Sequence, residues 1–165
     1  MSISNVWFAS DLHLGHSAIA KHRGFSSVEE HDSAILHNFQ CIKRKDKLFL
    51  LGDVVWNDKS LKLLDEIPGI KELIIGNHDR LQTKKYLKYF VKVHGFRKYQ
   101  DLWLSHCPIH PQEVYWCKGN VHGHIHKGAG TEDLGGSYFN VNVDFNKMSP
   151  TNFLTIQKYY EERYV

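Results

Sequence analysis

The chain has 165 residues, of which 42% are apolar and 24% charged, and its formal net charge is +3. This composition predicts one globular domain, residues 1–165, and excludes a disordered chain; the charge is too small to indicate nucleic acid by itself. There is no run of about 18 apolar residues, so we expect no membrane span. The N-terminal stretch MSISNVWFASD does not resemble a signal peptide, and the three cysteines lack CxxC spacing. We therefore expect reduced thiols in a cytoplasmic protein, either bacterial or, if phage-encoded, in the host cytoplasm.

Short apolar runs alternate with helical patterns in the first half of the chain, and strand patterns dominate the second half. The runs are rich in Val, Ile, Leu and aromatic residues, which favours strands buried on both faces over helices. Five expected strands each run into a polar cluster: Val6–Ser10, Lys47–Leu51, Lys71–Ile75, Asp101–Ser105 and Gly119–Val121.

Three helices are expected between these strands. The first follows SSVEE (residues 26–30), which has the spacing of a capping box, and the others cover about 58–66 and about 81–88. Later, SYFNVNVDF (137–145) alternates like a strand, and the segment from Pro150 predicts a closing helix or strand. The alternation predicts an α/β layered domain with a mixed sheet, in which ligands gather beyond the strand ends.

The polar clusters after the strands are weak signals when taken singly. DLH, GD and GNHD contain residues common in turns, and His106 could be a hydrogen-bonded core histidine. Asp, Asn or His at all five strand ends, however, is hard to attribute to chance. Carboxylate, carboxamide and imidazole without thiolate suit Mn²⁺, Fe²⁺, Ni²⁺, Co²⁺ or Zn²⁺, whereas a structural zinc would prefer four Cys or His ligands. The candidate ligands are too many for one ion and predict two metals that share a carboxylate: Asp11, His13, Asp53, Asn77, His106, His124 and His126.

The stretch VHGHIHKG, residues 121–128, places histidines at three alternate positions. A strand through this stretch would present all three rings on one face. His124 and His126 are candidate metal ligands, while His122 is interpreted as a hydrogen-bonding partner behind the ligands.

The order DLH, GD, GNHD, H and GHIH closely resembles the signature of the calcineurin-like metallophosphoesterase superfamily, D-x-H, G-D, G-N-H-[DE], H and G-H-x-H. The resemblance covers Ser10 to His126, and DLHLGH…SHCPIHP…NVHGHIH looks like the short, single-domain bacterial and phage members. It implies a four-layer α-β-β-α sandwich with two mixed β-sheets and a dinuclear centre at their rim. The implied ligands are Asp11, His13 and His126 for the first ion and Asn77, His106 and His124 for the second, with Asp53 bridging. Mn²⁺ is the favoured metal, with Fe, Ni, Co or Zn as alternatives.

The implied activity is hydrolysis of phosphate esters, phosphodiesters above all, by in-line attack of a metal-bridging hydroxide. Asn77 would help to hold the non-bridging oxygens. His78 would be the general acid that protonates the leaving oxygen, because an imidazole pKa lies near neutral pH. His16 is a candidate contact for the phosphate or leaving group, and Arg80 could clamp a phosphate; a loop histidine and a solvated Arg are the alternatives.

Three other functions stay open. A protein phosphatase is disfavoured because Trp56 stands where that branch of the superfamily has Asp, and its phosphate-gripping Arg is absent. A nuclease is an alternative because the basic segment KKYLKYFVKVHGFRK (84–98) could bind nucleic acid, although the favoured interpretation is that its apolar residues face the core and its lysines are solvated. A metal-stabilised binding module without catalysis is the third, and the sequence fixes neither the natural ester nor the oligomeric state.

Overall fold

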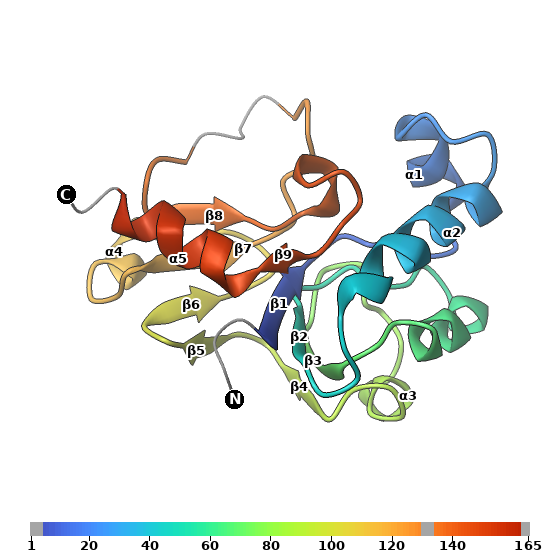
Figure 1. Cartoon of the computed structure of the whole chain (residues 1–165), viewed down its shortest axis with the longest axis horizontal. Coiled ribbons are helices and arrows are strands. Elements are labelled where there is room, and N and C mark those ends of the chain that lie inside the picture. Colours follow the sequence, from blue (N-terminus) through green and yellow to red (C-terminus); the bar gives the residue numbers. More distant parts are fainter. Residues whose placement is uncertain (1–4, 130–133, 163–165) are drawn as a thin grey trace.

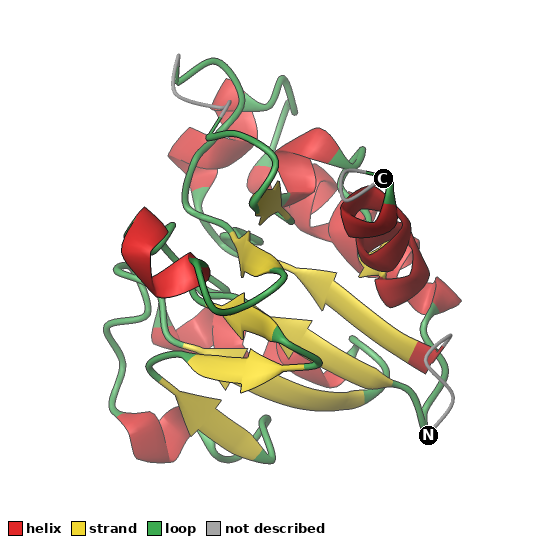
Figure 2. Ribbon diagram, turned by 90° about the vertical axis from the view of Figure 1, so that its left-hand side faces the viewer, coloured by secondary structure: helices red, strands yellow, loops and turns green. Residues whose placement is uncertain are grey.

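The computed structural model describes residues 5–129 and 134–162, with strands at the centre and helices around them (Figures 1 and 2). The strands are β1 (Val6–Ala9), β2 (Lys47–Leu50), β3 (Ile70–Ile74), β4 (Lys92–His94), β5 (Arg97–Tyr99), β6 (Leu102–Leu104), β7 (Gly119–His122), β8 (Tyr138–Asn140) and β9 (Thr151–Asn152). The α-helices are α1 (Ser17–His22), α2 (Val28–Asn38), α3 (Thr83–Tyr86), α4 (Pro111–Val114) and α5 (Phe153–Glu161). The 3₁₀-helices are η2 (Phe39–Cys41), η3 (Asp58–Asp65) and η4 (Val143–Phe145).

The described strands form two mixed sheets, which confirms the predicted α/β class. The first has the order β4-β3-β2-β1-β9, in which β1 to β4 are parallel and β9 is antiparallel to β1. The second has the order β5-β6-β7-β8, in which β6, β7 and β8 are parallel and β5 is antiparallel to β6. In each sheet the parallel strands end at the same edge, and this places the polar clusters that follow them close together.

Alternating side chains of the first sheet enter two different cores. One set packs against helices α2 and η3, and this core includes Ala9, Leu48, Leu50, Leu73, Ile35 and Leu64. The other set faces the second sheet, and that core includes Phe8, Phe49, Leu51, Leu102, Leu104 and Val121. The first sheet is therefore buried on both faces, as the continuous apolar runs predict.

Helix α5 packs against the core between the sheets and contributes Phe153, Ile156 and Tyr160 to it. The Tyr160 hydroxyl donates to the Asn120 carbonyl of β7 at 3.1 Å. Helix α4 is a single turn that accepts a hydrogen bond from the Trp103 indole. A helical layer, the first sheet and the second sheet thus follow one another, while the fourth layer of the expected sandwich stays a prediction.

The expected helices are present in part. Ser27 caps α2 as predicted, since its hydroxyl accepts from the backbone N–H of Glu30 at 3.1 Å. A helix was expected over about 58–66, and the 3₁₀-helix η3 (Asp58–Asp65) is found there, with the side chain of Asn57 capping its first turn. The expected helix at 81–88 is reduced to the single turn α3.

The end of the chain also differs from expectation. Only residues 138–140 of the stretch 137–145 form a strand, because the Asn142 side chain accepts from the backbone N–H of Asp144 at 2.9 Å and starts η4. The closing segment contains both alternatives, strand β9 and then helix α5.

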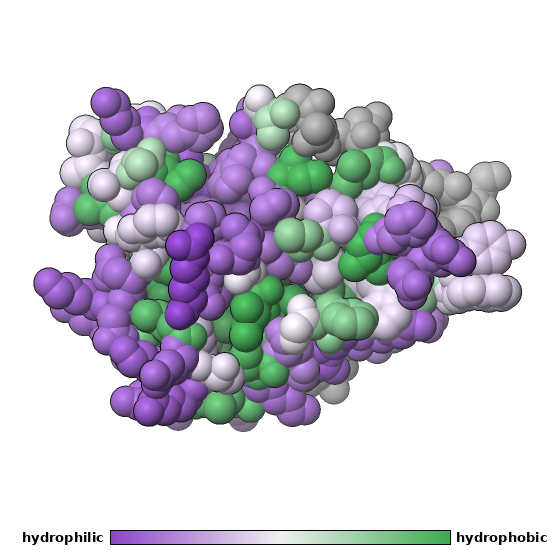
Figure 3. Space-filling model, turned by 180° about the vertical axis from the view of Figure 1, so that it is seen from behind, coloured by the Kyte–Doolittle hydropathy of each residue, from purple (hydrophilic) through white to green (hydrophobic). Residues whose placement is uncertain are grey.

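The surface seen from behind is mainly hydrophilic, with hydrophobic residues in separate patches (Figure 3). Among the described residues, no helix combines the length and the apolar character that a membrane crossing requires.

Candidate metal centre

The loops after five strands bring the predicted ligands together. Asp11 and His13 follow β1, and Asp53 follows β2. Backbone hydrogen bonds join these two loops, because the N–H of His13 donates to the carbonyl of Asp53 at 2.9 Å. In the second sheet, the N–H of Gly123 after β7 donates to the carbonyl of His106 after β6 at 2.8 Å. The N–H of His124 then donates to Asp11 Oδ2 at 2.9 Å, so a hydrogen bond also links the two sheets at the site.

Four of the predicted ligands have a left-handed backbone, with φ of +58° at Asp11, +49° at His13, +54° at Asp53 and +68° at His124. This conformation is uncommon for residues other than glycine and costs on the order of 1 kcal/mol or more each. The other described non-glycine residues with positive φ are two adjacent pairs, Gln100-Asp101 and Lys147-Met148. Single residues with a strained, left-handed backbone are thus concentrated at the predicted ligands, and this is typical of a functional site.

Three motif glycines leave the space that the ligands occupy. A Cβ on Gly52 would lie 2.5 Å from His106 Nδ1, and one on Gly76 would lie 2.6 Å from the backbone N of Asp53. A Cβ on Gly123 would lie 2.5 Å from Asp11 Oδ2. Glycine is required at these positions by close approach of the ligand loops.

The first group of ligands consists of Asp11, His13 and His126. Asp11 Oδ1 lies 3.8 Å from His13 Nε2 and 3.7 Å from His126 Nε2. These atoms are close enough to one another to bind a single ion. Asp53 Oδ2 lies 3.8 Å from His13 Nε2, so its carboxylate adjoins this group.

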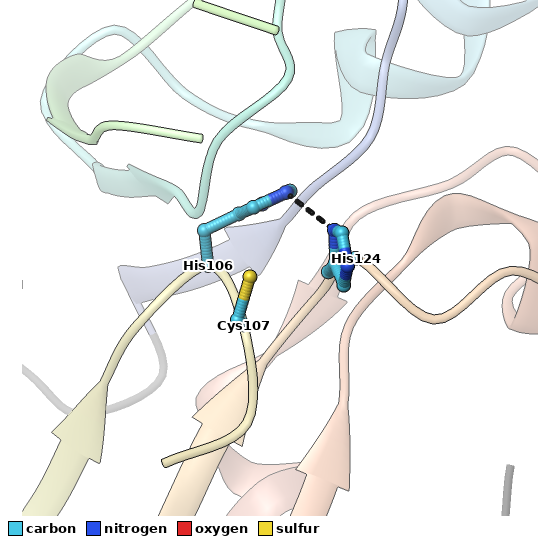
Figure 4. Close-up of side chains that lie close together, drawn as sticks. All are labelled: His106, Cys107 and His124. Carbon is cyan, nitrogen blue, oxygen red and sulfur yellow. Dashed lines mark hydrogen bonds between the residues drawn. The ribbon is translucent and has the colours of Figure 1, made fainter. Parts of the chain in front are cut away.

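The second group consists of Asn77, His106 and His124. His106 Nε2 lies 2.9 Å from Asn77 Oδ1 and 3.2 Å from His124 Nδ1, and Figure 4 shows the two rings directed toward each other. Asp53 Oδ2 is 3.4 Å from His106 Nε2 and therefore lies between the two groups. The Cys107 thiol also lies beside His106 and His124, and the sequence did not single it out as a ligand.

The donor atoms have the features of metal ligands. Within the described part of the chain, buried Asp11 Oδ1 and His13 Nε2 have no hydrogen-bond partner. Burial raises the pKa of Asp11 and lowers the pKa of His13 to about 3, so burial disfavours the charged form of each group, and the neutral His13 imidazole offers a lone pair to a cation. A bound cation would use both orphan atoms as ligands. The residues present therefore fit a metal ion, and groups that could hold one exist in this fold.

Hydrogen bonds orient two of the imidazoles so that Nε2 faces the centre. His106 Nδ1 donates to the Leu51 carbonyl at 2.7 Å, since a carbonyl can only accept. His126 Nδ1 lies 2.8 Å from Asp144 Oδ2 in the same way. A carboxylate or carbonyl behind a histidine fixes the tautomer and strengthens metal binding.

Asp144 and Arg23 support the first group, and sequence reasoning missed both. Asp144 Oδ1 accepts from Arg23 Nε and Nη2, each at 2.7 Å, and Arg23 Nη2 also donates to the Asp11 carbonyl at 2.8 Å. Burial alone would raise the pKa of Asp144, but the hydrogen bond from His126 and the charge of Arg23 hold it at about 2. This buried ion pair links two predicted ligands, His126 and Asp11. No sequence spacing signals it, because Arg23 and Asp144 are distant in the chain.

Asp79 joins the loops after β2 and β3. Its carboxylate accepts from the backbone N–H groups of Asp53 and Gly76 at 2.8 Å and of Val54 at 3.0 Å. Burial raises the pKa of Asp79 to about 6, although these hydrogen bonds oppose the shift. The final Asp of the GNHD motif therefore holds the backbone at the centre.

His78 lies at the edge of the ligand cluster. Its backbone N–H donates to Asp53 Oδ1 at 2.8 Å, and its ring centroid is 5.6 Å from that of His13. In the described chain, buried His78 Nδ1 has no hydrogen-bond partner. On the same side, the ring of His16 stacks on the indole of Trp56.

The two remaining candidates, His122 and Arg80, each donate a hydrogen bond to a backbone carbonyl beside the ligands. The strand ends at His122, whose Nδ1 donates to the Gly123 carbonyl at 2.8 Å, and burial lowers its pKa to about 4. The chain leaves the extended conformation at Gly123, so the expectation of three rings on one strand face was wrong. Arg80 is exposed, and its Nε is 3.4 Å from the Asn77 carbonyl.

The basic segment is partly neutralised. Lys85 pairs with Asp58, and Arg97 pairs with buried Glu72. Tyr86 is fully buried in the core, so its ring is not available for stacking on nucleic acid.

Part of this chain is similar in sequence to two phage proteins. No family model matches the chain. The gene 66 proteins of Mycobacterium phages L5 and D29 are each 37% identical to this chain over an alignment of 84 residues that covers 47% of it. The chain spans only 41% and 42% of the length of these relatives.

Among solved structures, a protein of unknown function from Aquifex aeolicus has a TM-score of 0.75 and 26% identity, over 93% of this chain and 97% of that one. It has the same fold as this chain. A variant of Vps29 from Entamoeba histolytica has a TM-score of 0.45 and 16% identity, over 82% of this chain and 72% of that one, which is too low to inform either fold or function.

Proposed function

We propose that this chain is a metal-dependent phosphoesterase of the calcineurin-like type, a single-domain four-layer sandwich that hydrolyses phosphodiesters. One observation carries the proposal. The carboxylate of Asp53 lies between two donor groups, 3.8 Å from His13 Nε2 on one side and 3.4 Å from His106 Nε2 on the other. A bridging carboxylate with imidazoles on both sides is the donor arrangement expected for paired divalent ions.

The residues suit two ions, with Mn²⁺ favoured. Asp11, His13 and His126 would hold the first ion, Asn77, His106 and His124 the second, and Asp53 both. When bound, such ions supply Lewis acidity and a nucleophile from water near neutral pH. The Asn77 amide lies at the exposed side of the centre and would also orient a non-bridging phosphate oxygen.

The geometry favours His78 as the general acid. The hydrogen bond from its backbone N–H to Asp53 Oδ1 ties its position to the bridging carboxylate. The ring is half-buried, and within the described residues its Nδ1 has no hydrogen-bond partner, so no other protein group is bonded to this nitrogen. An imidazole there would protonate the leaving oxygen.

The test measures hydrolysis of bis-p-nitrophenyl phosphate and of p-nitrophenyl phosphate by protein loaded with Mn²⁺. His78→Ala should lower the rate about 10²–10⁴-fold and leave the melting temperature nearly unchanged, because the lost group acts in proton transfer. The matched control is His37→Ala, an exposed histidine on α2, which should change neither quantity.

Three outcomes would contradict the proposal or a part of it. No turnover on either ester with Mn²⁺, Fe²⁺, Ni²⁺, Co²⁺ or Zn²⁺ would do so, and if the metal still raised the melting temperature, a metal-stabilised binding module would be favoured. Equal loss of rate and of stability in His78→Ala would instead assign this residue a structural role. Hydrolysis of nucleic acid alone would identify the chain as a nuclease.

A further inference from the structure

Four rings form a connected cluster at one side of the candidate metal centre. His13 contacts His16 and His78, with ring centroids 5.7 Å and 5.6 Å away. Trp56 in turn contacts His16 at 3.7 Å and His78 at 5.4 Å. The rings of His16 and His78 therefore connect the indole to the predicted metal ligand His13, and the indole directly contacts His78, the candidate general acid.

The backbone of Trp56 is held firmly at this place. Its N–H donates to the Leu14 carbonyl at 2.9 Å, and Leu14 forms a β-bridge with Val55. The next residue, Asn57, caps the first turn of η3 through its side chain. The backbone at Trp56 is thus fixed to the loop that carries His13.

One face of the indole is covered and the ring is still partly open to solvent. The planes of His16 and Trp56 are inclined by only 27°, so the imidazole stacks flat on one face of the indole. Trp56 nevertheless remains 42% exposed. A large ring that is preorganised by stacking and partly open to solvent can stack with a second planar group.

We propose that Trp56, backed by His16, is the platform on which the planar leaving group of a phosphoester stacks. The inference rests on the proposed function in that it takes the phosphate to lie at the metal centre. His78 marks the side of the leaving oxygen, and Trp56 is the aromatic side chain next to it. The preferred esters therefore carry an aryl group or a nucleobase near the leaving oxygen, and aliphatic esters bind less well.

The test compares two phosphonates of equal charge and similar size, phenylphosphonate and cyclohexylphosphonate. Their dissociation constants from the Mn²⁺-loaded protein are measured by isothermal titration calorimetry, which needs no turnover. The unmodified protein should bind the phenyl compound more tightly, on the order of tenfold. The preference should fall close to one in Trp56→Ala and should be largely kept in Trp56→Phe.

Trp116→Ala is the matched control, because Trp116 is 84% exposed and lines a separate cavity beside α5. Its preference should equal that of the unmodified protein. A preference that survives in Trp56→Ala would overturn the platform, even if both affinities fell, because Trp56 would then act only on the shape of the site. Failure of both phosphonates to bind would also overturn it.

The two proposals can fail separately. Loss of the aryl preference in Trp56→Ala, without diester hydrolysis by the unmodified protein, would support the platform and contradict the phosphoesterase. Diester hydrolysis by a protein that binds the two phosphonates equally well would support the phosphoesterase and contradict the platform.

Discussion

Replacing Asp144 by Asn would remove the charge that joins Arg23 to His126. Asp144 accepts two hydrogen bonds from Arg23 at 2.7 Å and one from His126 at 2.8 Å. The side chain of Arg23 is 3% exposed and that of Asp144 is 7% exposed, so solvent cannot replace the lost carboxylate. Asn would leave a buried guanidinium without its counter-ion and would weaken the acceptor behind a predicted metal ligand.

The magnitude follows from this burial. Removing one partner of a buried ion pair costs about 3–5 kcal/mol, and Asn retains one acceptor oxygen, so we expect about 3 kcal/mol. In a domain of this size each 1 kcal/mol lowers the melting temperature by about 2–4 °C, which predicts a fall of roughly 6–12 °C. Affinity for Mn²⁺ should fall about 10–100-fold, because His126 loses its orienting carboxylate.

The assay is thermal unfolding of the metal-free protein by circular dichroism, followed by calorimetric titration with Mn²⁺. Asp58→Asn is the matched control, since it breaks a solvent-exposed pair with Lys85 and should cost about 1 kcal/mol or less. If Asp144→Asn melted within a degree of the unmodified protein and bound Mn²⁺ equally well, the role assigned to this ion pair would be refuted.

Three further predictions concern the centre and the first sheet. Gly76→Ala should destabilise the fold by about 1–3 kcal/mol and weaken metal binding, measured by chemical denaturation and titration, because its Cβ would lie 2.6 Å from the backbone N of Asp53. Glu72→Gln should cost about 2 kcal/mol at neutral pH, since buried Glu72 binds Lys47 and Arg97. Burial of Glu72 opposes a lowering of its pKa, but the cations Lys47 and Arg97 lower it nonetheless. The stability that the carboxylate contributes is therefore complete above pH about 4.5 and is lost as the pH falls through the lower folded pKa. Over that range the difference in the free energy of unfolding between Glu72→Gln and the unmodified protein should narrow in denaturation experiments. Cys107→Ser should leave Mn²⁺ affinity within about twofold in the same titration, because oxygen and imidazole donors complete the centre without the thiol.

Each of these three predictions has a control variant or a result that would contradict it. Gly95→Ala should be neutral, because the new Cβ meets no atom within 4 Å, and an equal loss in both glycine variants would remove the steric explanation. If the difference in stability between Glu72→Gln and the unmodified protein stayed constant down to pH 3, folding would not lower the pKa of Glu72 and the prediction would be refuted. A loss of Mn²⁺ in Cys107→Ser as large as in His124→Ala would identify the thiol as a ligand.

The sequence predicted the fold class because the strands of the first sheet are buried on both faces. Phe49 enters one core and Leu50 the other, and this produces continuous apolar runs that are easily recognised. The prediction of secondary structure failed where a side chain caps a turn locally. Asn142 turns an alternating stretch into a 3₁₀-helix, and the strand pattern around it gives no sign of this.

The site shows the same division between local pattern and distant contact. Candidate ligands such as Asp53 could be chosen because polar residues follow each strand in order. The buried pair of Arg23 and Asp144 could not, since it joins the end of α1 to η4, which only the fold brings together. The left-handed backbone at Asp11 and His13 could not be predicted from the sequence either, because the surrounding loops impose it.

Anomalous diffraction at the manganese edge, from crystals grown with Mn²⁺, tests the central claim most directly. We expect two manganese peaks about 3.5–4 Å apart on either side of the Asp53 carboxylate, one facing His13 and the other facing His106. A site without manganese, or manganese bound only elsewhere on the molecule, would contradict it.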